Sequence, residues 1–342
     1  MKVGIIGCGL IGRKRVLSLQ NDDILVACCD INEEIGIKFS EEFKCDYFNK
    51  YSDLIKLTDC DIIIVSVINK FAKEIVLHAL KHNKHVLLEK PMGRNVKESL
   101  SMYNESLKHQ KIFKIGFNHR FHPAILKAKE LLNSIGKILF IRAHYGHGGR
   151  PYMETEWRAS KDLCGGGELL DQGVHLIDLC RWFVGEVKSV FGQVETKFWD
   201  IEVEDNAFML LKIIDNTDSN QYWHNESMTS VIDAQLHVSW TNWKNSFQFE
   251  IYGSEGYLKI NGLGGWYGKE TLEFGLKNLG KVPNIRTYAY DSDDSWAKEW
   301  ENLKESINNN VQPIGNYEDG LKANTIIEAV YKSSLKNKII KL

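Results

Sequence analysis

The spacing of apolar positions in the first third of the chain predicts a parallel sheet. Short continuous apolar runs alternate with segments of helical spacing, which is typical of buried parallel strands joined by helices. The apolar runs lie at 3–6, 24–29, 61–67, 85–89 and 111–117. Helical spacing is clearest from Phe71 to His82. In an open parallel sheet, ligands bind beyond the carboxyl ends of the strands.

From about residue 121 the pattern changes to that of an α+β domain. A helix is predicted from Pro123 to Leu132, a strand over 138–144 and a final helix over about 319–334. Alternation with a period of two predicts further strands at 188–198, 207–214, 230–240, 246–252 and 257–260. Short turns join successive strands, so a mostly antiparallel sheet is expected. The segment 215–229 is polar and irregular, and no role is assigned to it. We therefore predict two domains, 1–120 and 121–342.

Composition and charge restrict the classes of partner. The 342 residues are 43% hydrophobic and 26% charged, with a net charge of −2, which is ordinary for a soluble globular protein. This balance gives no electrostatic reason to expect a nucleic acid or a membrane surface as partner. No apolar run approaches the roughly 20 residues that cross a bilayer, and the N-terminus enters a strand without a signal peptide. The seven cysteines lie mostly in apolar stretches and are expected to be free thiols, without a metal site, in the cytoplasm.

A glycine-rich turn, Gly7-Cys8-Gly9-Leu10-Ile11-Gly12, follows the first strand directly. In such a turn the first glycine makes the bend, the second admits a pyrophosphate and the third lets the next helix pack closely. The helix N-terminus then faces the phosphates with its N–H groups. The second strand ends at Asp30, 18 positions after Gly12, where a carboxylate can bind ribose hydroxyls and repel a 2′-phosphate. The alternative role for Asp30 is to cap the next turn. The pattern predicts a Rossmann domain that prefers NAD to NADP.

Polar residues follow several strands of the predicted parallel sheet. Besides Asp30, they are Asn69, Glu89, Lys90 and Asn118. Because these positions fall at the carboxyl ends of strands, we expect all of them to lie near the cofactor.

The segment 168–183 is a nearly apolar predicted helix with a polar stripe made of Asp171, His175 and Asp178. Burying such groups is costly unless they are paired or face a cleft. One alternative is therefore a core histidine held by a neighbouring carboxylate. The other is a catalytic group, because a lysine, an aspartate and a histidine beside a nucleotide fold can move a proton while a hydride moves elsewhere.

Several motifs together resemble the Gfo/Idh/MocA oxidoreductases, the family of glucose–fructose oxidoreductase and inositol dehydrogenase. They are the glycine turn at 7–12, Glu89-Lys90-Pro91, the stretch from Asn118 to Pro123, the Gly166 to Asp178 pattern, Glu204-Asp205-Asn206-Ala207 and the C-terminal segment 334–342. The resemblance spans nearly the whole chain. Members often have Thr-Pro-Asn and then a histidine after the third strand, whereas this chain has Val67-Ile68-Asn69 and Ala72.

The resemblance implies a Rossmann domain followed by a domain with a large open sheet, through which homodimers or homotetramers form. It also implies NAD(P)-dependent hydride transfer at a carbinol or carbonyl carbon of a sugar, polyol or sugar derivative. Lys90 and His175 would then lie at the reacting oxygen, and Asp171 would complete a catalytic triad. His175 suits the base, because an imidazole titrates near neutral pH, and Lys90 suits stabilisation of the alkoxide.

Candidate substrate residues precede the polar helix. Arg150, Trp157 and Arg158 suit an anionic sugar, such as a sugar phosphate, uronate or nucleotide-sugar, or are surface arginines beside a packed tryptophan. Arg120 is included from the motif that begins at Asn118, and His144 and His147 flank the same glycine stretch. Three other functions remain open: a non-catalytic NAD(P)-binding regulator, a reductase of C=C or C=N bonds, and a metal-dependent hydrolase.

Overall fold

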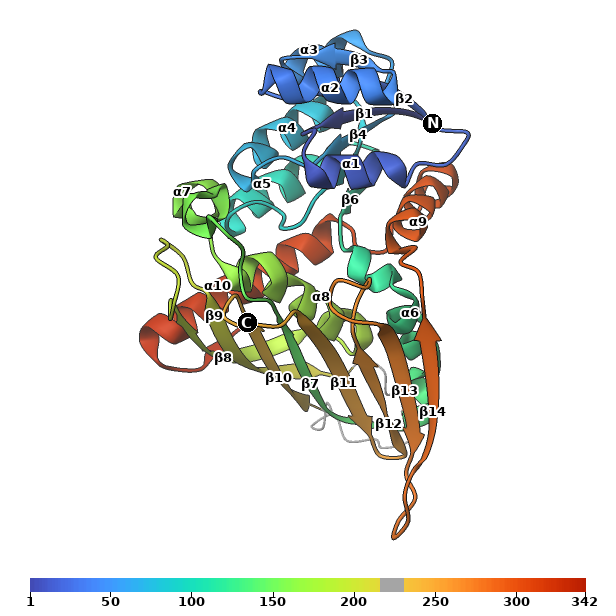
Figure 1. Cartoon of the computed structure of the whole chain (residues 1–342), viewed down its shortest axis with the longest axis vertical. Coiled ribbons are helices and arrows are strands. Elements are labelled where there is room, and N and C mark those ends of the chain that lie inside the picture. The colour runs from blue at the N-terminus through green and yellow to red at the C-terminus, as the bar shows by residue number, and fades with distance from the viewer. Residues whose placement is uncertain (216–230) are drawn as a thin grey trace. The chain divides into compact units, whose positions relative to one another are not determined.

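A computed structural model describes residues 1–215 and 231–342 (Figure 1). Except for Asp215, the polar segment 215–229 lies outside the described residues. The chain divides into two compact units. Unit 1 comprises Met1–Asn118, Asp162–Gly165 and Trp296–Asn324, and unit 2 comprises His119–Lys161, Gly166–Ser295 and Thr325–Leu342.

Unit 1 contains the predicted parallel sheet. Its strands, among the described residues, run in the order β3-β2-β1-β4-β5-β6 and are all parallel. They are β1 (Lys2–Ile6), β2 (Ile24–Cys29), β3 (Asp46–Phe48), β4 (Ile62–Val65), β5 (His85–Leu88) and β6 (Phe113–Ile115). The helices between them are α1 (Leu10–Leu17), α2 (Glu33–Phe43), α3 (Tyr51–Leu57), α4 (Asn69–Lys81) and α5 (Val96–Ser106). The strand order reverses between β1 and β4, which is where dinucleotides bind in this fold.

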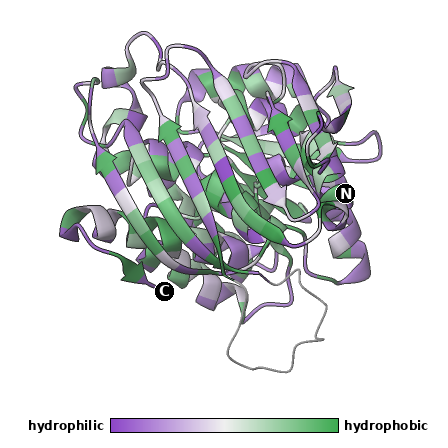
Figure 2. Cartoon of the chain, turned by 90° about the horizontal axis from the view of Figure 1, so that it is seen from below, coloured by the Kyte–Doolittle hydropathy of each residue, from purple (hydrophilic) through white to green (hydrophobic). Residues whose placement is uncertain are grey.

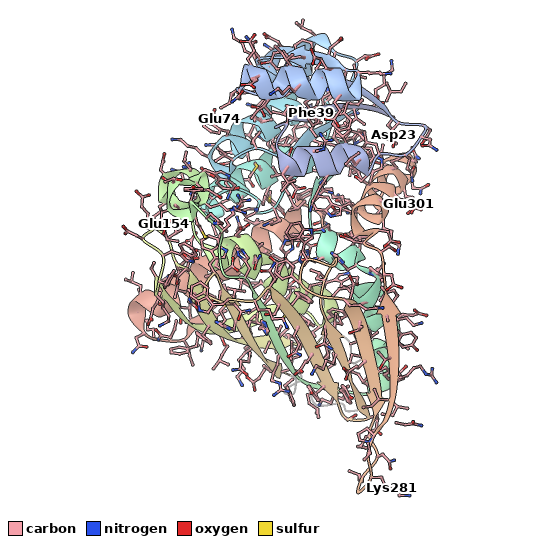
Figure 3. The ribbon with its side chains drawn as sticks, viewed as in Figure 1. Asp23, Phe39, Glu74, Glu154, Lys281 and Glu301 are labelled. Atoms are coloured by element: carbon pink, nitrogen blue, oxygen red, sulfur yellow. The ribbon has the colours of Figure 1, made fainter. Side chains whose placement is uncertain are left out.

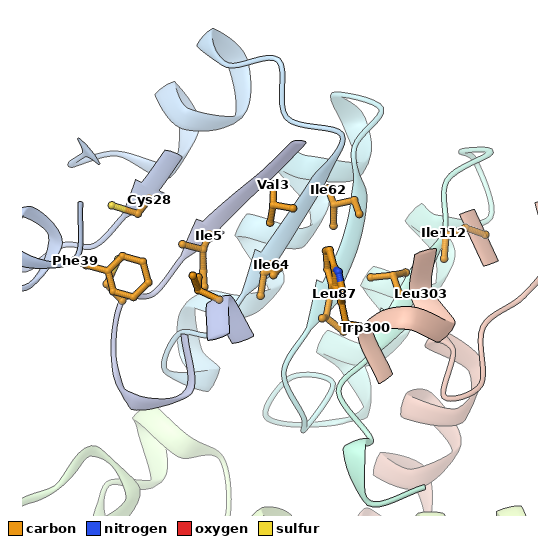
Figure 4. Close-up of a cluster of buried hydrophobic side chains, with 12 residues drawn as sticks. Val3, Ile5, Cys28, Phe39, Ile62, Ile64, Leu87, Ile112, Trp300 and Leu303 are labelled. Atoms are coloured by element: carbon orange, nitrogen blue, oxygen red, sulfur yellow. The ribbon is translucent and has the colours of Figure 1, made fainter. Parts of the chain in front are cut away.

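A late part of the chain also belongs to unit 1. Helix α9 (Ser295–Asn309) places Trp300 and Leu303 in an apolar cluster with Ile64 and Leu87 (Figure 4). The Trp300 Nε1 donates to Asp23 Oδ2 at 2.6 Å, and Figure 3 labels Asp23 at the turn before β2. This differs from the predicted division at residue 120. The apolar face of α9 is buried against the first sheet, a long-range contact that local periodicity does not reveal.

Unit 2 is built on a large mixed sheet. In the described part of the chain its strand order is β14-β13-β12-β11-β7-β10-β9-β8-β15, and the β7–β10 pair alone among these neighbours is parallel. The mostly antiparallel sheet is thus confirmed. Its strands are β7 (Ile138–Gly146), β8 (Val187–Glu195), β9 (Asn206–Ile214), β10 (Val231–Ser239), β11 (Ser246–Gly253), β12 (Gly256–Asn261), β13 (Glu270–Leu276), β14 (Asn284–Tyr290) and β15 (Ile340–Lys341). Helices α6 (Pro123–Leu131), α8 (Val174–Phe183) and α10 (Tyr317–Lys336) complete the predicted set, whereas β13, β14 and β15 are not predicted.

One face of this sheet is buried and the other is open. Along β9, Ala207, Met209 and Leu211 are buried, whereas Phe208 and Leu210 are exposed. Figure 2 shows the strands with their alternating apolar and polar positions. The period-two alternation therefore separates a core face from an open face.

The cysteines and the helices bear on the expected free thiols and on the absence of a membrane span. All seven cysteines fall within the described ranges and are free thiols, and six of them are buried. None of the helices among the described residues is long and apolar enough to cross a membrane.

Candidate functional site

The glycine turn between β1 and α1 has the shape that a dinucleotide requires. Gly7 has a φ of +99°, and a Cβ on Gly12 would lie 2.0 Å from the Gly7 carbonyl oxygen. A Cβ on Gly9 would meet nothing within 4 Å, so the protein's own packing does not demand glycine there. The open space beside Gly9 is where a pyrophosphate would approach the backbone. The N-cap residue of α1 is Gly9, which has no side chain to cap the helix, so the N–H groups near Leu10 and Ile11 suit the phosphates.

Asp30 lies at the end of β2, beside this turn. Its Oδ2 accepts from the Cys8 N–H at 2.9 Å and its Oδ1 accepts from the Asn32 N–H at 2.8 Å. The second bond is the turn cap that the sequence left open as an alternative. Because the two bonds fix a half-buried carboxylate next to the turn, the geometry fits an acceptor for ribose hydroxyls as well.

Two of the predicted cofactor residues have partners within unit 1. The Asn69 Nδ2, in the first turn of α4, donates to the Cys164 carbonyl oxygen at 2.8 Å. The Glu89 Oε1 accepts from the Arg15 Nε at 2.5 Å, and Arg15 also pairs with Glu299 at 2.5 Å. These contacts give Asn69 and Glu89 a role in holding unit 1 together, which the sequence did not indicate.

The other two follow the last strands of the parallel sheet. Lys90 follows β5, is half-buried and precedes Pro91 in a cis peptide bond. Asn118 is buried and begins a 3₁₀ turn, Asn118–Phe121. Both therefore occupy the strand-end positions where ligands bind to parallel sheets.

The predicted helix over 168–183 begins as a π-helix. Leu169–Gly173 is a π-helical segment, and α8 continues from Val174. Glu204 anchors the first residues of this segment by two hydrogen bonds. The Glu168 N–H donates to the Glu204 carbonyl oxygen at 3.0 Å, and the Leu169 N–H donates to the Glu204 Oε1 at 3.1 Å. A Cβ on Gly167 would lie 1.9 Å from that carbonyl oxygen. Single π-helical turns occur frequently at functional sites, and this one carries Asp171.

The polar stripe on this segment separates into residues with different partners. Asp178 is fully buried and forms a two-bond ion pair with Arg120, with Nε–Oδ2 at 2.8 Å and Nη2–Oδ1 at 2.5 Å. Arg120 is itself 4% exposed. The guanidinium of Arg120 therefore neutralises a buried carboxylate, and its predicted substrate role stays a prediction.

His175 is buried beside a second histidine. Its ring lies nearly parallel to that of His119, with centroids 3.6 Å apart and an angle of 14°. The His119 Nε2 contacts the Tyr145 Oη at 3.2 Å, and Gln172 Nε2 donates to the Tyr267 Oη at 2.7 Å. Burial raises the pKa of Tyr145 well above its usual value. Burial also raises the pKa of Tyr267 to about 12, so both hydroxyls keep their protons near neutral pH.

The sequence missed the residues around His175 to different degrees. His119 lies within the motif from Asn118 to Pro123, but nothing marked it as a neighbour of His175. Tyr145 follows the predicted strand 138–144 on the same side as Ile141 and Ala143, so extending the alternation would have found it. Tyr267 lies in a loop without a sequence signal.

Asp171 lies at one end of a row of alternating charges. Arg158 Nε is 3.3 Å from Asp171 Oδ2, and Arg158 Nη1 is 3.8 Å from Glu156 Oε2. Glu156 in turn forms two bonds of 2.5 Å with Arg150. Trp157 packs against Arg158, whose Cζ lies 4.3 Å from the ring centroid. The four predicted substrate residues of this row, Arg150, Trp157, Arg158 and Asp171, are thus brought together within unit 2.

The two histidines that flank the glycine stretch differ in position. His147 interacts electrostatically with Asp171, Arg150 and Arg158, and burial is the main cause that lowers its pKa. His144 instead contacts Ser246 and lies on the opposite face of β7 from Tyr145. Only His147 therefore belongs to the group around Asp171.

Comparison with known proteins identifies the family. The oxidoreductase family with an NAD-binding Rossmann fold matches residues 1–117, and the GFO/IDH/MocA C-terminal domain matches residues 125–259. Glucose-6-phosphate 3-dehydrogenase of Bacillus subtilis is 26% identical over 346 residues, which cover 97% of this chain and 95% of that protein. Myo-inositol 2-dehydrogenase of Thermotoga maritima is 25% identical over 361 residues, with 100% and 98% covered.

The fold is also that of solved structures. Levoglucosan dehydrogenase in complex with NADH superposes with a TM-score of 0.86 at 20% identity, and the match covers 100% of this chain and 98% of that one. The glycine turn, the parallel sheet and the two matched domains lead to one assignment. The chain belongs to the Gfo/Idh/MocA family of oxidoreductases, and its N-terminal part is the family's NAD-binding Rossmann fold.

Proposed function

We propose that this oxidoreductase moves a hydride between NAD and a carbinol or ketone carbon of a neutral sugar or polyol. The observation that carries the proposal is the buried His175 on the helical segment that also bears the Asp171–Arg158 pair. Relatives are named for glucose 6-phosphate, myo-inositol and levoglucosan. A polyhydroxylated ring is the feature that these three compounds share.

The residues of the chain divide the proton chemistry. NAD⁺, held at the glycine turn and by Asp30, would supply the acceptor for a hydride from the carbon that carries the hydroxyl group. His175 takes the hydroxyl proton, so the substrate becomes a ketone while the proton remains on the imidazole. Lys90 stabilises the negative charge that develops on the oxygen. Asp171, held by Arg158, orients a neighbouring substrate hydroxyl. In the reverse direction the same groups deliver a proton to a ketone oxygen.

The charges near Asp171 favour a neutral substrate over the anionic sugars that the sequence also allowed. Two arginines, Arg150 and Arg158, stand beside two carboxylates, Glu156 and Asp171. A phosphate would have to displace Glu156 from Arg150, which loses two charge-assisted hydrogen bonds. Hydroxyl groups can add to this row of donors and acceptors without breaking the ion pairs.

A substrate panel tests the proposal. We expect purified protein with NAD⁺ to show NADH absorbance with neutral sugars, polyols or anhydrosugars, and kcat/KM at least about tenfold lower with the matching sugar phosphates. Turnover only with nucleotide-sugars or sugar phosphates would contradict the neutral substrate. NADH binding without turnover of any alcohol or ketone would contradict the dehydrogenase, and oxidation of NADH by an unsaturated or imine substrate would assign the C=C or C=N reductase instead.

We also propose that the open face of the unit 2 sheet joins copies of this chain into a dimer or tetramer. This face carries a row of aromatic and aliphatic side chains, in which Phe140 stacks on Tyr252 and Phe208 on His237, and Leu210 is exposed. Exposed apolar patches of this kind mark interaction surfaces.

The free cysteines favour a reducing compartment, and we propose the cytoplasm.

A charge placed on the open face is expected to separate the copies. Leu210→Arg would bury a guanidinium without a counter-charge in an apolar interface. The molar mass measured by light scattering during gel filtration should therefore fall to that of a smaller assembly. Leu107→Arg, at an equally exposed leucine of unit 1, is the control and should leave the mass unchanged. A wild-type protein that is monomeric at the highest measurable concentration would contradict the interface.

A further inference from the structure

An exposed group of aromatic rings lies at one end of the unit 2 sheet. Phe198 follows β8 and Trp243 follows β10, and their side chains are 62% and 67% exposed. The two rings meet edge to face, with centroids 4.9 Å apart and an angle of 79°. Trp199 joins them, because its ring lies 5.2 Å from that of Phe198 at an angle of 88°. We call these three residues the aromatic rim.

Hydrogen bonds to buried groups hold the aromatic rim in place. Asp205 is fully buried, and its carboxylate accepts from three successive backbone N–H groups. They belong to Lys197 and Phe198, at 2.8 Å, and to Trp199, at 3.0 Å. The Trp199 indole N–H donates to the Trp240 carbonyl oxygen at 2.9 Å. Side chains that are already fixed lose little freedom when a ligand binds, so the rim is preorganised for binding.

The aromatic rim adjoins the Arg150 end of the row of alternating charges. A Cβ on Gly149 would lie 2.3 Å from Cζ2 of Trp199, and a Cβ on Gly148 would lie 3.1 Å from Cε3 of Trp243. Both indoles therefore pack on the backbone that leads directly into Arg150. The opposite end of the row carries the aspartate of the proposed site. The rim thus continues the candidate substrate site outward within unit 2.

The charges beside the aromatic rim cancel. The segments 195–200 and 240–245 together contain two acidic residues and two lysines, and Lys197 forms an ion pair with Glu195. Arg150 is already bound to Glu156 by two hydrogen bonds. A phosphate or diphosphate therefore has no electrostatic reason to bind here. Aromatic faces without net charge suit the C–H face of a neutral sugar ring.

We propose that the aromatic rim is a second sugar subsite: the substrate is a neutral glycoside whose oxidised ring lies at Asp171 and His175 and whose second ring lies on Phe198 and Trp243. This inference rests on the proposed function and names its substrate class more closely. The hydride and the proton move as described above, and the glycosidic bond stays intact.

Binding measured without turnover tests the subsite. Glucose, maltose, cellobiose and trehalose would each be titrated calorimetrically into the full-length protein loaded with NADH. Glucose is chosen because one relative is named for glucose 6-phosphate, and the three disaccharides differ in their linkage. We expect one disaccharide to bind at least about tenfold more tightly than glucose, because its second ring adds contact with two aromatic side chains. Equal or weaker binding of all three disaccharides would overturn the proposal.

Variants of the rim locate the second ring. Trp243→Ala and Phe198→Ala should each lower the affinity for the tighter disaccharide about tenfold, towards that of glucose. Leu279→Ala is the control and should leave the affinity unchanged. This leucine is 84% exposed and lies in the hairpin between β13 and β14, whose Lys281 is labelled in Figure 3, at the other end of the sheet. Loss of affinity for glucose and the disaccharide by the same factor would make the rings structural and overturn the subsite.

Two further measurements separate this proposal from its alternatives. A smaller molar mass of Trp243→Ala in light scattering, with unchanged disaccharide binding, would show that the rim joins copies of the chain, and the subsite would be wrong. Tight binding of a disaccharide without NADH formation from any sugar and NAD⁺ would instead count against the dehydrogenase and leave the subsite standing.

Discussion

His175→Ala is expected to lower kcat/KM by about 10²–10⁴-fold, the range for loss of a general base. The imidazole is the group on the Leu169–Phe183 segment that can hold a proton near neutral pH, and it is buried where water replaces it poorly. The rate should be measured by NADH formation at saturating NAD⁺. The substitution lies in unit 2, so cofactor binding by unit 1 is expected to be unchanged. A change confined to KM would contradict a role in the chemical step.

Lys90 supplies the partner variants for this experiment. Lys90→Ala should lower kcat/KM by a similar factor. Lys90→Arg should recover little of this activity, because a planar, delocalised guanidinium does not replace the compact charge of an ammonium group. NADH binding, followed by fluorescence, is the control and should survive in His175→Ala. The double variant tests whether the two losses are independent: a loss far smaller than the product of the two single losses would mean that both groups act in the same step.

Arg120→Ala is expected to lower the free energy of unfolding by about 3–5 kcal/mol, because it leaves the Asp178 carboxylate buried without its counter-charge. Both side chains are almost completely inaccessible, and two hydrogen bonds join them. Urea unfolding of the variant and the wild type gives the difference.

Two further variants separate charge burial from side-chain loss. Arg13→Ala removes an arginine from a pair with Glu42 in which both side chains are 40% or more exposed, and should leave the free energy of unfolding nearly unchanged. Arg120→Met combined with Asp178→Leu should restore most of the stability, since apolar replacement of a buried pair is often neutral. A normal unfolding free energy with a raised KM for the Arg120→Ala protein would instead support the substrate role of Arg120.

Local sequence was sufficient where local geometry decides the outcome. Gly7, Gly9 and Gly12 follow a buried strand, and the backbone demands of that turn predicted the dinucleotide fold before any contact was known. The alternation along 207–214 likewise predicted β9 and its two faces. Asp30 was placed correctly at the end of β2 because a strand followed by a turn fixes its position.

Partners distant in the sequence were not predictable in this way. The sequence did not show that Glu89 pairs with Arg15 or that Arg120 pairs with Asp178. An ionisable side chain after a strand or on a helix has the same sequence pattern whether it binds a ligand or forms an ion pair within the protein. Its distance to an opposite charge, which the sequence does not give, distinguishes the two roles.

The sequence by itself determined the parallel sheet with its cofactor turn, the antiparallel character of the second sheet and the segment that bears Asp171 and His175. These follow from periodicity and glycine geometry, which act over a few neighbouring residues. Only the tertiary structure placed α9 in unit 1, started the 168–183 helix as a π-helix and stacked His119 on His175. Those features arise from contacts between segments about 55 or more residues apart, or from hydrogen bonds to a distant residue such as Glu204. Burial and electrostatic interactions there depend on distances in space, which no local sequence pattern encodes.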